Sequence, residues 1–176
     1  MNNEDSLRFP IGKFSAKASY DTAELQMLID QIESLPARIE ALVSTFSDAR
    51  FEMRYRSGGW TARQVLHHLP DSHMNGYIRM KWTLTEETPL IKAYNEKLWA
   101  ETPETTRHPG ISLNFLNALH VKWVALLRML APQHLTRSFL HPETNKQLSI
   151  ERMIALYAWH GEHHLAHLKL VAAAEQ

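Results

Sequence analysis

The chain has 176 residues and a mass of 20.4 kDa, a length that fits one domain with a substantial buried core. Nineteen Lys and Arg residues balance nineteen Asp and Glu residues, so the concentrated positive charge that favours a nucleic-acid partner is missing. Because the sequence contains no cysteine, disulfides, thiolate metal ligands and a cysteine nucleophile are excluded. Any metal site must therefore use histidine, carboxylate, carbonyl or water ligands.

The composition also argues against export and against a membrane location. The N-terminal stretch "MNNEDSLRFPIGKFSAKASY" begins polar and acidic, without the basic and then apolar order of a signal peptide. No apolar run approaches the ~20 residues that a membrane-spanning helix needs. We therefore expect no membrane and no nucleic acid among the partners of this protein.

The first predicted helix runs from about Asp21 to Phe46, where apolar side chains recur at helical spacings between Leu25 and Val43. Pro36 lies inside this stretch. Proline removes a backbone hydrogen bond and crowds the preceding turn, so we expect a kink or a break just before it.

The second predicted helix begins after "SGGW" and runs to about Thr85. Thr61 followed three residues later by Gln64 is typical of a capping box, in which each side chain accepts a hydrogen bond from an unpaired backbone N–H. Pro70 lies inside this helix and predicts a bend there.

The rest of the chain contains a long connection, two helices and a hairpin. Residues 86–110 are rich in proline, threonine and charge, and a connection of this length is usually functional or carries a short helix of its own. The third helix is predicted from Ser112, as its N-cap, to about Leu130. "PETNK" lies between short apolar runs and predicts a small hairpin. The fourth helix takes Ser149 as its N-cap and reaches about Ala173.

Four amphipathic helices in one small domain predict an all-α four-helix bundle. It has a long connection between its second and third helices and a short hairpin before the fourth. We assign residues 9–174 to this single domain.

The fourth helix contains "YAWHGEHHLAHL", with four of the eleven histidines of the chain. On a helical wheel His164 falls near the centre of the apolar arc, and His160 lies within about 50° of it. His163 and His167 fall about 110° and 70° away, which predicts flanking positions, next to a metal or in an interface. Two inward imidazoles at i and i+4 leave polar nitrogens in the core, and a divalent metal would satisfy them.

The spacing of this pair resembles the zinc motif H-E-x-x-H, in which a glutamate directly after the first histidine is the general base. Here Gly161 holds that position, and Glu162 lies about 100° further round the helix. We therefore do not expect a protease of that type.

A third ligand should come from another helix, and "QVLHHLPDSHMN" in the second helix is the richest source. His67, His68 and His73 are all suitable by chemistry. Periodicity favours His73, on the apolar side of the helix, but the bend expected at Pro70 makes the helical phase unreliable. The spacing leaves the choice open.

Several stretches occur in an order that resembles the YfiT-like branch of the DinB superfamily: "YRSGGWTARQVLHHLPDSHMNGYIRMKWTLTEETPLIKAYNEKLWAE", "LHVKWVALLRML", "FLHPE" and "ALYAWHGEHHLAHL". The resemblance extends from about Phe9 to Leu170. It implies a bacterial four-helix bundle described as a metal-dependent hydrolase, with one divalent ion, zinc or nickel, held by three histidines and water. By this resemblance the ligands are His68, eight residues after Trp60, together with His160 and His164. This chain departs from the pattern at Pro70, where similar proteins tend to have alanine.

The same resemblance implies a cytoplasmic homodimer that acts on a small molecule. Relatives in the superfamily join low-molecular-weight thiols such as bacillithiol, mycothiol or glutathione to electrophiles. A thiol that binds a metal loses its proton and becomes nucleophilic, which suits a metal site with an open position.

Other side chains near these motifs are candidates for supporting roles. Glu162 and Asp71 could accept the second N–H of a histidine ligand. The auxiliary candidates for the pocket are Asn75, His120, Tyr94 and Glu96. The general base is not identified.

Two functions remain open from the sequence. The first is a metal-dependent hydrolase or thiol S-transferase that uses His68, His160 and His164 to activate water or a thiol through the metal. The alternative is a non-catalytic, metal-binding or stress-related dimer, whose histidines serve assembly or sensing.

Overall fold

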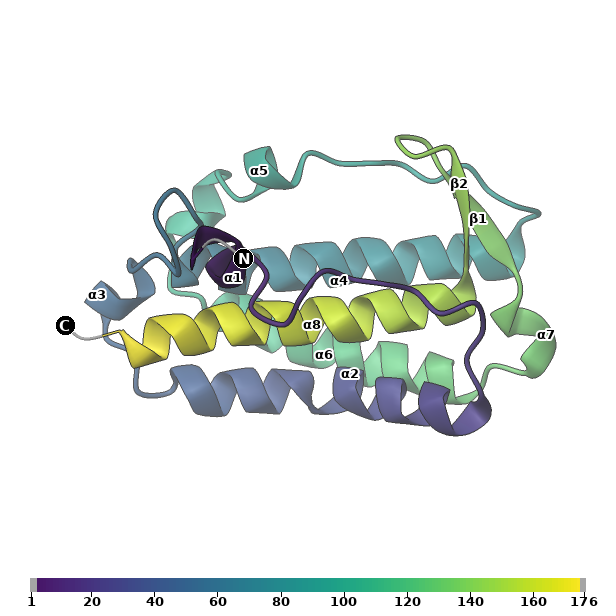
Figure 1. Ribbon diagram of the computed structural model, residues 1–176, viewed down its shortest axis with the longest axis horizontal. Coiled ribbons are helices and arrows are strands. Elements are labelled where there is room, and N and C mark those ends of the chain that lie inside the picture. Colours follow the sequence, from purple (N-terminus) through teal and green to yellow (C-terminus); the bar gives the residue numbers. More distant parts are fainter. Residues whose placement is uncertain (1–2, 175–176) are drawn as a thin grey trace.

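The computed structural model describes residues 3–174 and consists mainly of four long helices that pack side by side (Figure 1). These are α2 (Thr22–Val43), α4 (Ala62–Thr85), α6 (Gly110–Arg128) and α8 (Ile150–Ala173). The shorter elements are α1 (Asn3–Arg8), α3 (Asp48–Phe51), α5 (Glu96–Trp99), the 3-10 helix η1 (Pro103–Thr106), α7 (Pro132–Leu135), β1 (Ser138–His141) and β2 (Lys146–Ser149). The predicted four-helix bundle, with its hairpin before the last helix, is confirmed.

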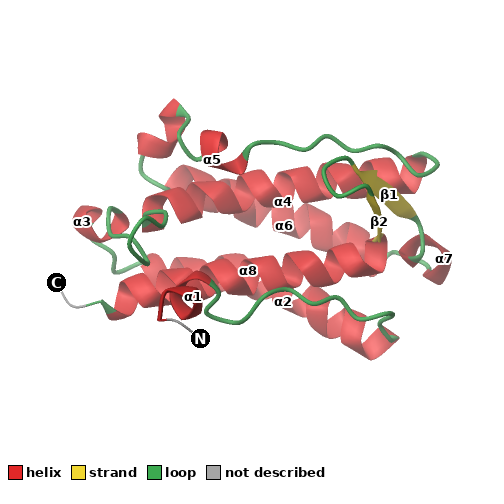
Figure 2. Cartoon of the chain, turned by 45° about the horizontal axis from the view of Figure 1, so that its top comes forward, coloured by secondary structure: helices red, strands yellow, loops and turns green. Residues whose placement is uncertain are grey.

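The order of the helices around the bundle differs from their order in the chain. α2 packs against α6 and α8, and α4 packs against the same two helices, so α2 and α4 lie diagonally opposite each other. The long connection after α4 runs back along the bundle before α6 begins, which leaves α4 and α6 parallel (Figures 1 and 2). It contains α5 and η1, as its length predicted.

Three of the four predicted helix starts are confirmed by their caps. Thr61 and Gln64 form the predicted capping box of α4, and Ser149 caps α8. Asp21 caps α2 through a second capping box with Glu24. Both α2 and α4 continue through their internal prolines as single helices, so the break that was one expectation at Pro36 does not occur.

The predicted N-cap of the third helix is wrong by three residues. α6 begins at Gly110 with Pro109 as its N-cap, so Ser112 lies inside the first turn. The Ser112 hydroxyl is hydrogen-bonded to Nδ1 of His67 at 2.7 Å instead. A tertiary contact therefore uses the side chain that local pattern assigned to a cap.

The bundle core is divided along its length by the histidines of α4 and α8. One apolar cluster lies around Trp123, Ile154 and Phe139, and the other lies around Leu35, Leu66 and Leu168. At the level between these two clusters α8 lies close to α2. The close approach is visible at Gly161, where an added Cβ would collide with the side chain of Leu35. This glycine allows the close helix packing that brings the histidines together.

By length and composition alone, α6 could cross a membrane, although no apolar run of that length was expected in the chain. A third of the most apolar 18-residue stretch of α6 is buried in the bundle. The core helix of a soluble protein can have the same length and composition as a membrane-spanning helix. Leu116, Leu119 and Trp123 of α6 are core residues. Ile111, Phe115 and Val121 are exposed on its outer side.

Candidate metal centre

Three histidines from two helices meet inside the bundle. His68 of α4 and His160 and His164 of α8 each bring a ring nitrogen to within 4.8 Å of the other two. The Nε2 atoms of His68 and His160 are 3.2 Å apart. Two nitrogens at 2.0–2.1 Å from a tetrahedral ion would lie about 3.3–3.4 Å apart, so this spacing fits a shared divalent ion.

The choice between His68 and His73, which the spacing left open, has a structural explanation. His68 points into the three-histidine cluster, and the ring of Trp60 packs against it with 4.6 Å between centroids. His73 lies one level further along α4 and is fully buried. Its Nε2 is 3.1 Å from Nδ1 of His160, on the side of that ring away from His68. Periodicity thus identified a neighbour of the cluster rather than one of its three members.

His120 of α6 lies behind His73 and is also buried. Its Nε2 is 2.8 Å from Nδ1 of His73, and its own Nδ1 is 2.6 Å from the carbonyl oxygen of Ile32. The auxiliary role predicted for His120 in lining a pocket does not match this position, because its ring is enclosed between α2, α4 and α6 and lines neither cavity described below.

His163 and His167 were expected on the flank of α8, and both are buried. The N-terminal segment covers them: Phe9 stacks on His163, and Nε2 of His167 is 3.2 Å from the carbonyl oxygen of Arg8. Tyr55 stacks on His167 with 3.8 Å between ring centroids. A wheel of α8 cannot show segments that fold over it from elsewhere in the chain.

Burial holds these histidines in the neutral form that metal binding requires. Loss of solvation, with a smaller repulsion from His163, lowers the pKa of His68 to about 4. Burial likewise lowers the pKa of His160 and His164 well below 6.5, and neighbouring imidazoles add to the effect. Burial also lowers the pKa of His120 to about 4.

Two cavities flank the cluster, and His160 lines both. The first, of about 640 Å³, also contains His68 and His164 and opens past α1 and the loop before α4. Its mouth carries Arg8, Arg54, Arg56 and Lys97, against the carboxylates of Glu96 and Glu101. The second, of about 680 Å³, lies towards the hairpin and is lined by Ser72, Arg79, Tyr94, His141 and Tyr157 among others.

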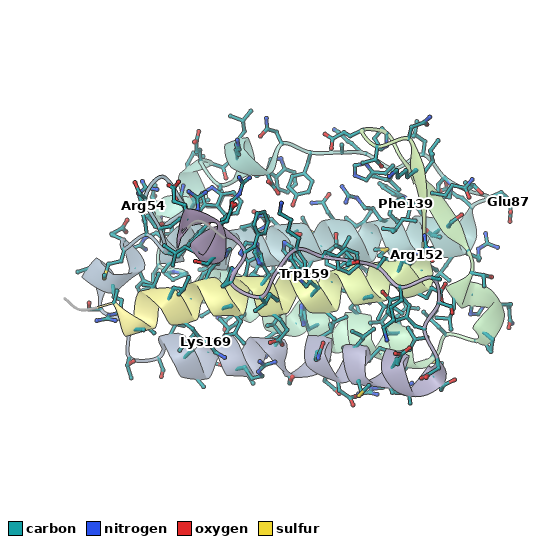
Figure 3. The ribbon with its side chains drawn as sticks, in the orientation of Figure 1. Arg54, Glu87, Phe139, Arg152, Trp159 and Lys169 are labelled. Carbon is teal, nitrogen blue, oxygen red and sulfur yellow. The ribbon has the colours of Figure 1, made fainter. Side chains whose placement is uncertain are left out.

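The buried side-chain nitrogen and oxygen atoms without a hydrogen-bond partner, among the described side chains of residues 4–174, all belong to residues that line these cavities. Arg56 Nε, Trp159 Nε1 and His163 Nδ1 belong to the first cavity, and Arg79 Nε and His141 Nδ1 belong to the second. Figure 3 shows Trp159 on α8 beside the N-terminal segment and Arg54 near α1. Buried unpaired donors are costly, so these atoms mark surfaces that a bound molecule could satisfy.

The remaining predicted auxiliary residues fall into two groups. Glu162 forms a two-pronged ion pair with Arg38 of α2, and Asn75 donates to the backbone carbonyl of Asp71, so these interactions tie them to the scaffold. Asp71 is half-buried, which raises its pKa to about 6, and it lines neither cavity. Tyr94 and Glu96 do line a cavity, as expected of them.

Sequence reasoning missed Arg8, Phe9, Tyr55 and Arg56. They come from the N-terminal segment and from the loop between α3 and α4, where no helical periodicity gives a side chain a direction. The aromatic and basic composition of "MRYRSGGW" was the only available signal.

The fold and the cluster together define a class of protein: a four-helix bundle with three histidines gathered at its centre. The family model for the DinB superfamily matches residues 31–168, and this chain belongs to that superfamily. YfiT of Bacillus subtilis is 44% identical over 93% of this chain and 92% of its own length. A protein of Oceanobacillus iheyensis is 46% identical over 92% of this chain and 93% of its own. Both carry names that propose a metal-dependent hydrolase.

The solved structure of Bacillus subtilis YfiT has the same fold as this chain. It superposes with a TM-score of 0.92 and 42% sequence identity, and it covers 94% of this chain and 95% of that one. It is described as a probable metal-dependent hydrolase with an unusual four-helix bundle topology.

Proposed function

We propose that this protein is a metal-dependent enzyme in which His68, His160 and His164 hold one divalent ion, zinc or nickel. The observation that carries the proposal is the meeting of three imidazoles from two helices, with nitrogens within 4.8 Å, beside a cavity of about 640 Å³. A cluster that had only a structural role would be closed by a fourth protein ligand. The names of its relatives in the DinB superfamily support the same proposal.

The reaction that suits the site is hydrolysis or transfer of a thiol. An ion with open positions would supply Lewis acidity towards water, a thiol or a carbonyl group. The protein contributes a recessed cavity, an aromatic wall from Trp60 and Trp159, and a mouth with four cationic side chains against two carboxylates. This excess of positive charge favours an anionic small molecule, a class that includes low-molecular-weight thiols with carboxylate groups.

The test combines metal analysis with two assays. Purified protein loaded with zinc or nickel should contain one ion per chain and should hydrolyse esters or amides, or conjugate thiols to electrophiles, in a broad panel. His164→Ala, a matched control that removes only one imidazole, should lose both metal and turnover. Metal at one ion per chain without turnover across the panel would support the alternative of a non-catalytic metal-binding dimer.

The assembly and location of the protein are proposals too. We propose a cytoplasmic homodimer, on the resemblance to the YfiT-like proteins. Sedimentation velocity at micromolar concentration should give twice the mass of the chain, and cell fractionation should place the protein with cytoplasmic markers. A monomer in sedimentation, or recovery with the membrane fraction, would contradict this proposal.

A further inference from the structure

The hydrogen bonds behind His160 determine which of its ring nitrogens carries a proton. A carbonyl oxygen only accepts hydrogen bonds, so the contact of 2.6 Å with Ile32 requires the proton of neutral His120 to be on Nδ1. Nε2 of His120 is then an acceptor, and its partner at 2.8 Å, Nδ1 of His73, must be the donor. Nε2 of His73 is in turn an acceptor, and Nδ1 of His160 donates to it across 3.1 Å.

The end of this chain of hydrogen bonds is the metal centre. With its proton on Nδ1, neutral His160 has a bare lone pair on Nε2. That nitrogen is the one that lies 3.2 Å from Nε2 of His68. Through His120 and His73, the backbone carbonyl of Ile32 thus fixes the tautomer of His160.

A second, shorter relay has the same logic on the other side of the cluster. The carbonyl oxygen of Arg8 is 3.2 Å from Nε2 of His167, so the proton of His167 is on that nitrogen. Nδ1 of His167 is then the acceptor for Nδ1 of His164 at 3.4 Å. The remaining nitrogen of His164, Nε2, is therefore unprotonated as well.

We propose that His73, His120 and His167 are positioning residues, whose relays to backbone carbonyls present His160 and His164 to a metal with Nε2 already unprotonated. This proposal rests on the metal-binding role proposed above. Histidine ligands usually pass their second N–H to a carboxylate, a carbonyl or water. Here an imidazole takes that place in both cases, which explains why buried histidines surround the three of the cluster.

The relays lower the cost of binding the ion. A histidine with no fixed partner can carry its proton on either nitrogen, and a proton on Nε2 must move before the metal binds. A ring already held in the right tautomer and orientation loses less freedom on binding. The gain appears as tighter metal binding without any change in the ligands themselves.

The relays can be tested directly on the metal-free protein by nitrogen-15 NMR of labelled histidines at pH 8. The expected tautomer is Nδ1–H for His73, His120, His160 and His164, and Nε2–H for His167. A proton on Nε2 of His160 or of His164 would overturn the proposal. This measurement does not require metal to bind, so it stays decisive if the proposed function fails.

Zinc affinity, measured by competition with a chromophoric chelator, tests the consequence. His120→Leu removes the acceptor for His73 and should weaken zinc binding about 10–100-fold. His120→Gln should retain affinity close to that of the natural protein, because its amide oxygen can accept from His73. His67→Leu is the matched control: its imidazole is equally buried, but it bonds to Ser112 and to the carbonyl of Arg107 rather than to the cluster.

The outcomes separate a positioning role from a merely structural one. Equal losses of zinc affinity in His120→Leu and His67→Leu would overturn the proposal, as would a failure of His120→Gln to restore affinity. A loss confined to His120→Leu, with a Nε2–H signal appearing at His160, would support it. If His120→Leu does not fold, the tautomers of the natural protein and the His120→Gln affinity still decide.

Discussion

At the scale of single residues, burial keeps the histidines neutral, and this makes the stability of the fold depend on pH. Burial lowers the pKa of His68, His120, His163 and His167 to about 4, from an ordinary value of 6.5. Between these values the unfolded chain binds more protons than the folded one. The stability that neutral burial provides is therefore complete above pH 6.5 and is lost as the pH falls towards 4.

We accordingly expect the melting temperature of the metal-free protein to fall steadily as pH is lowered from about 6.5 to 4. Protons also compete with the metal for the imidazoles, so the loaded protein should release its ion only as the pH falls towards the lowered pKa of His68, about 4. Thermal unfolding and metal content at each pH check both results. A melting temperature that is constant over this range would contradict the burial argument, and equal stability of the two forms would contradict a contribution from the ion.

The ligands and their neighbours should respond differently to truncation. His68→Ala should purify without metal and remain helical, because removing one of three ligands weakens binding by orders of magnitude. His67→Ala and His163→Ala should retain metal, and His73→Ala should lose at most about 10–100-fold in affinity. Metal analysis and circular dichroism of the variants provide the comparison. A metal-free His73→Ala beside a metal-loaded His68→Ala would reverse the assignment.

The histidines of the cluster could be predicted only where a regular helix defined the direction of their side chains. The wheel placed His160 and His164 correctly, because α8 is a regular helix with a clear apolar arc. On α4 periodicity favoured His73 over His68, although both side chains are buried and lie at different levels of the helix. The resemblance chose His68, and the structure brings it to the other two.

At the scale of elements, local signals predicted the helices that begin with a side-chain cap. Asp21, Thr61 and Ser149 each accept a hydrogen bond from the first turn of the helix that follows. α6 has no side-chain cap, and Ser112 was mistaken for one. The diagonal arrangement of α2 and α4 left no local signal, because it depends on which apolar faces meet.

The contact between α2 and α8 gives a prediction about Gly161. A methyl group there would collide with Leu35, so Gly161→Ala should destabilise the protein by about 1–3 kcal/mol, although alanine normally favours a helix. Urea unfolding measures the change. The double variant with Leu35→Ala is the control, since relief of the collision makes its loss smaller than the sum of the single losses. A more stable Gly161→Ala protein would show that the helices can separate freely.

At the scale of the whole molecule, the site is completed by a segment outside the bundle. Residues 9–20 run along α8 after α1, as both views show (Figures 1 and 2). Phe14 packs on Trp159, and the carbonyl of Ala18 accepts a hydrogen bond from Arg152 at 3.5 Å. Although the predicted domain starts at residue 9, α1 before it supplies the carbonyl of Arg8 to His167.

Deletion of residues 1–19 should therefore affect the metal centre more than the bundle. The four long helices keep their mutual contacts, so helicity should be retained, whereas His163 and His167 become exposed to solvent. Without the Arg8 carbonyl the His167 tautomer is no longer fixed, and zinc affinity should fall about 10–100-fold. Phe9→Ala is the matched control, because it removes the cover over His163 and keeps that carbonyl. Unchanged zinc affinity in the truncated protein would mean that the bundle alone organises the site. A loss of affinity larger than that of Phe9→Ala would mean that the Arg8 carbonyl contributes to the metal site.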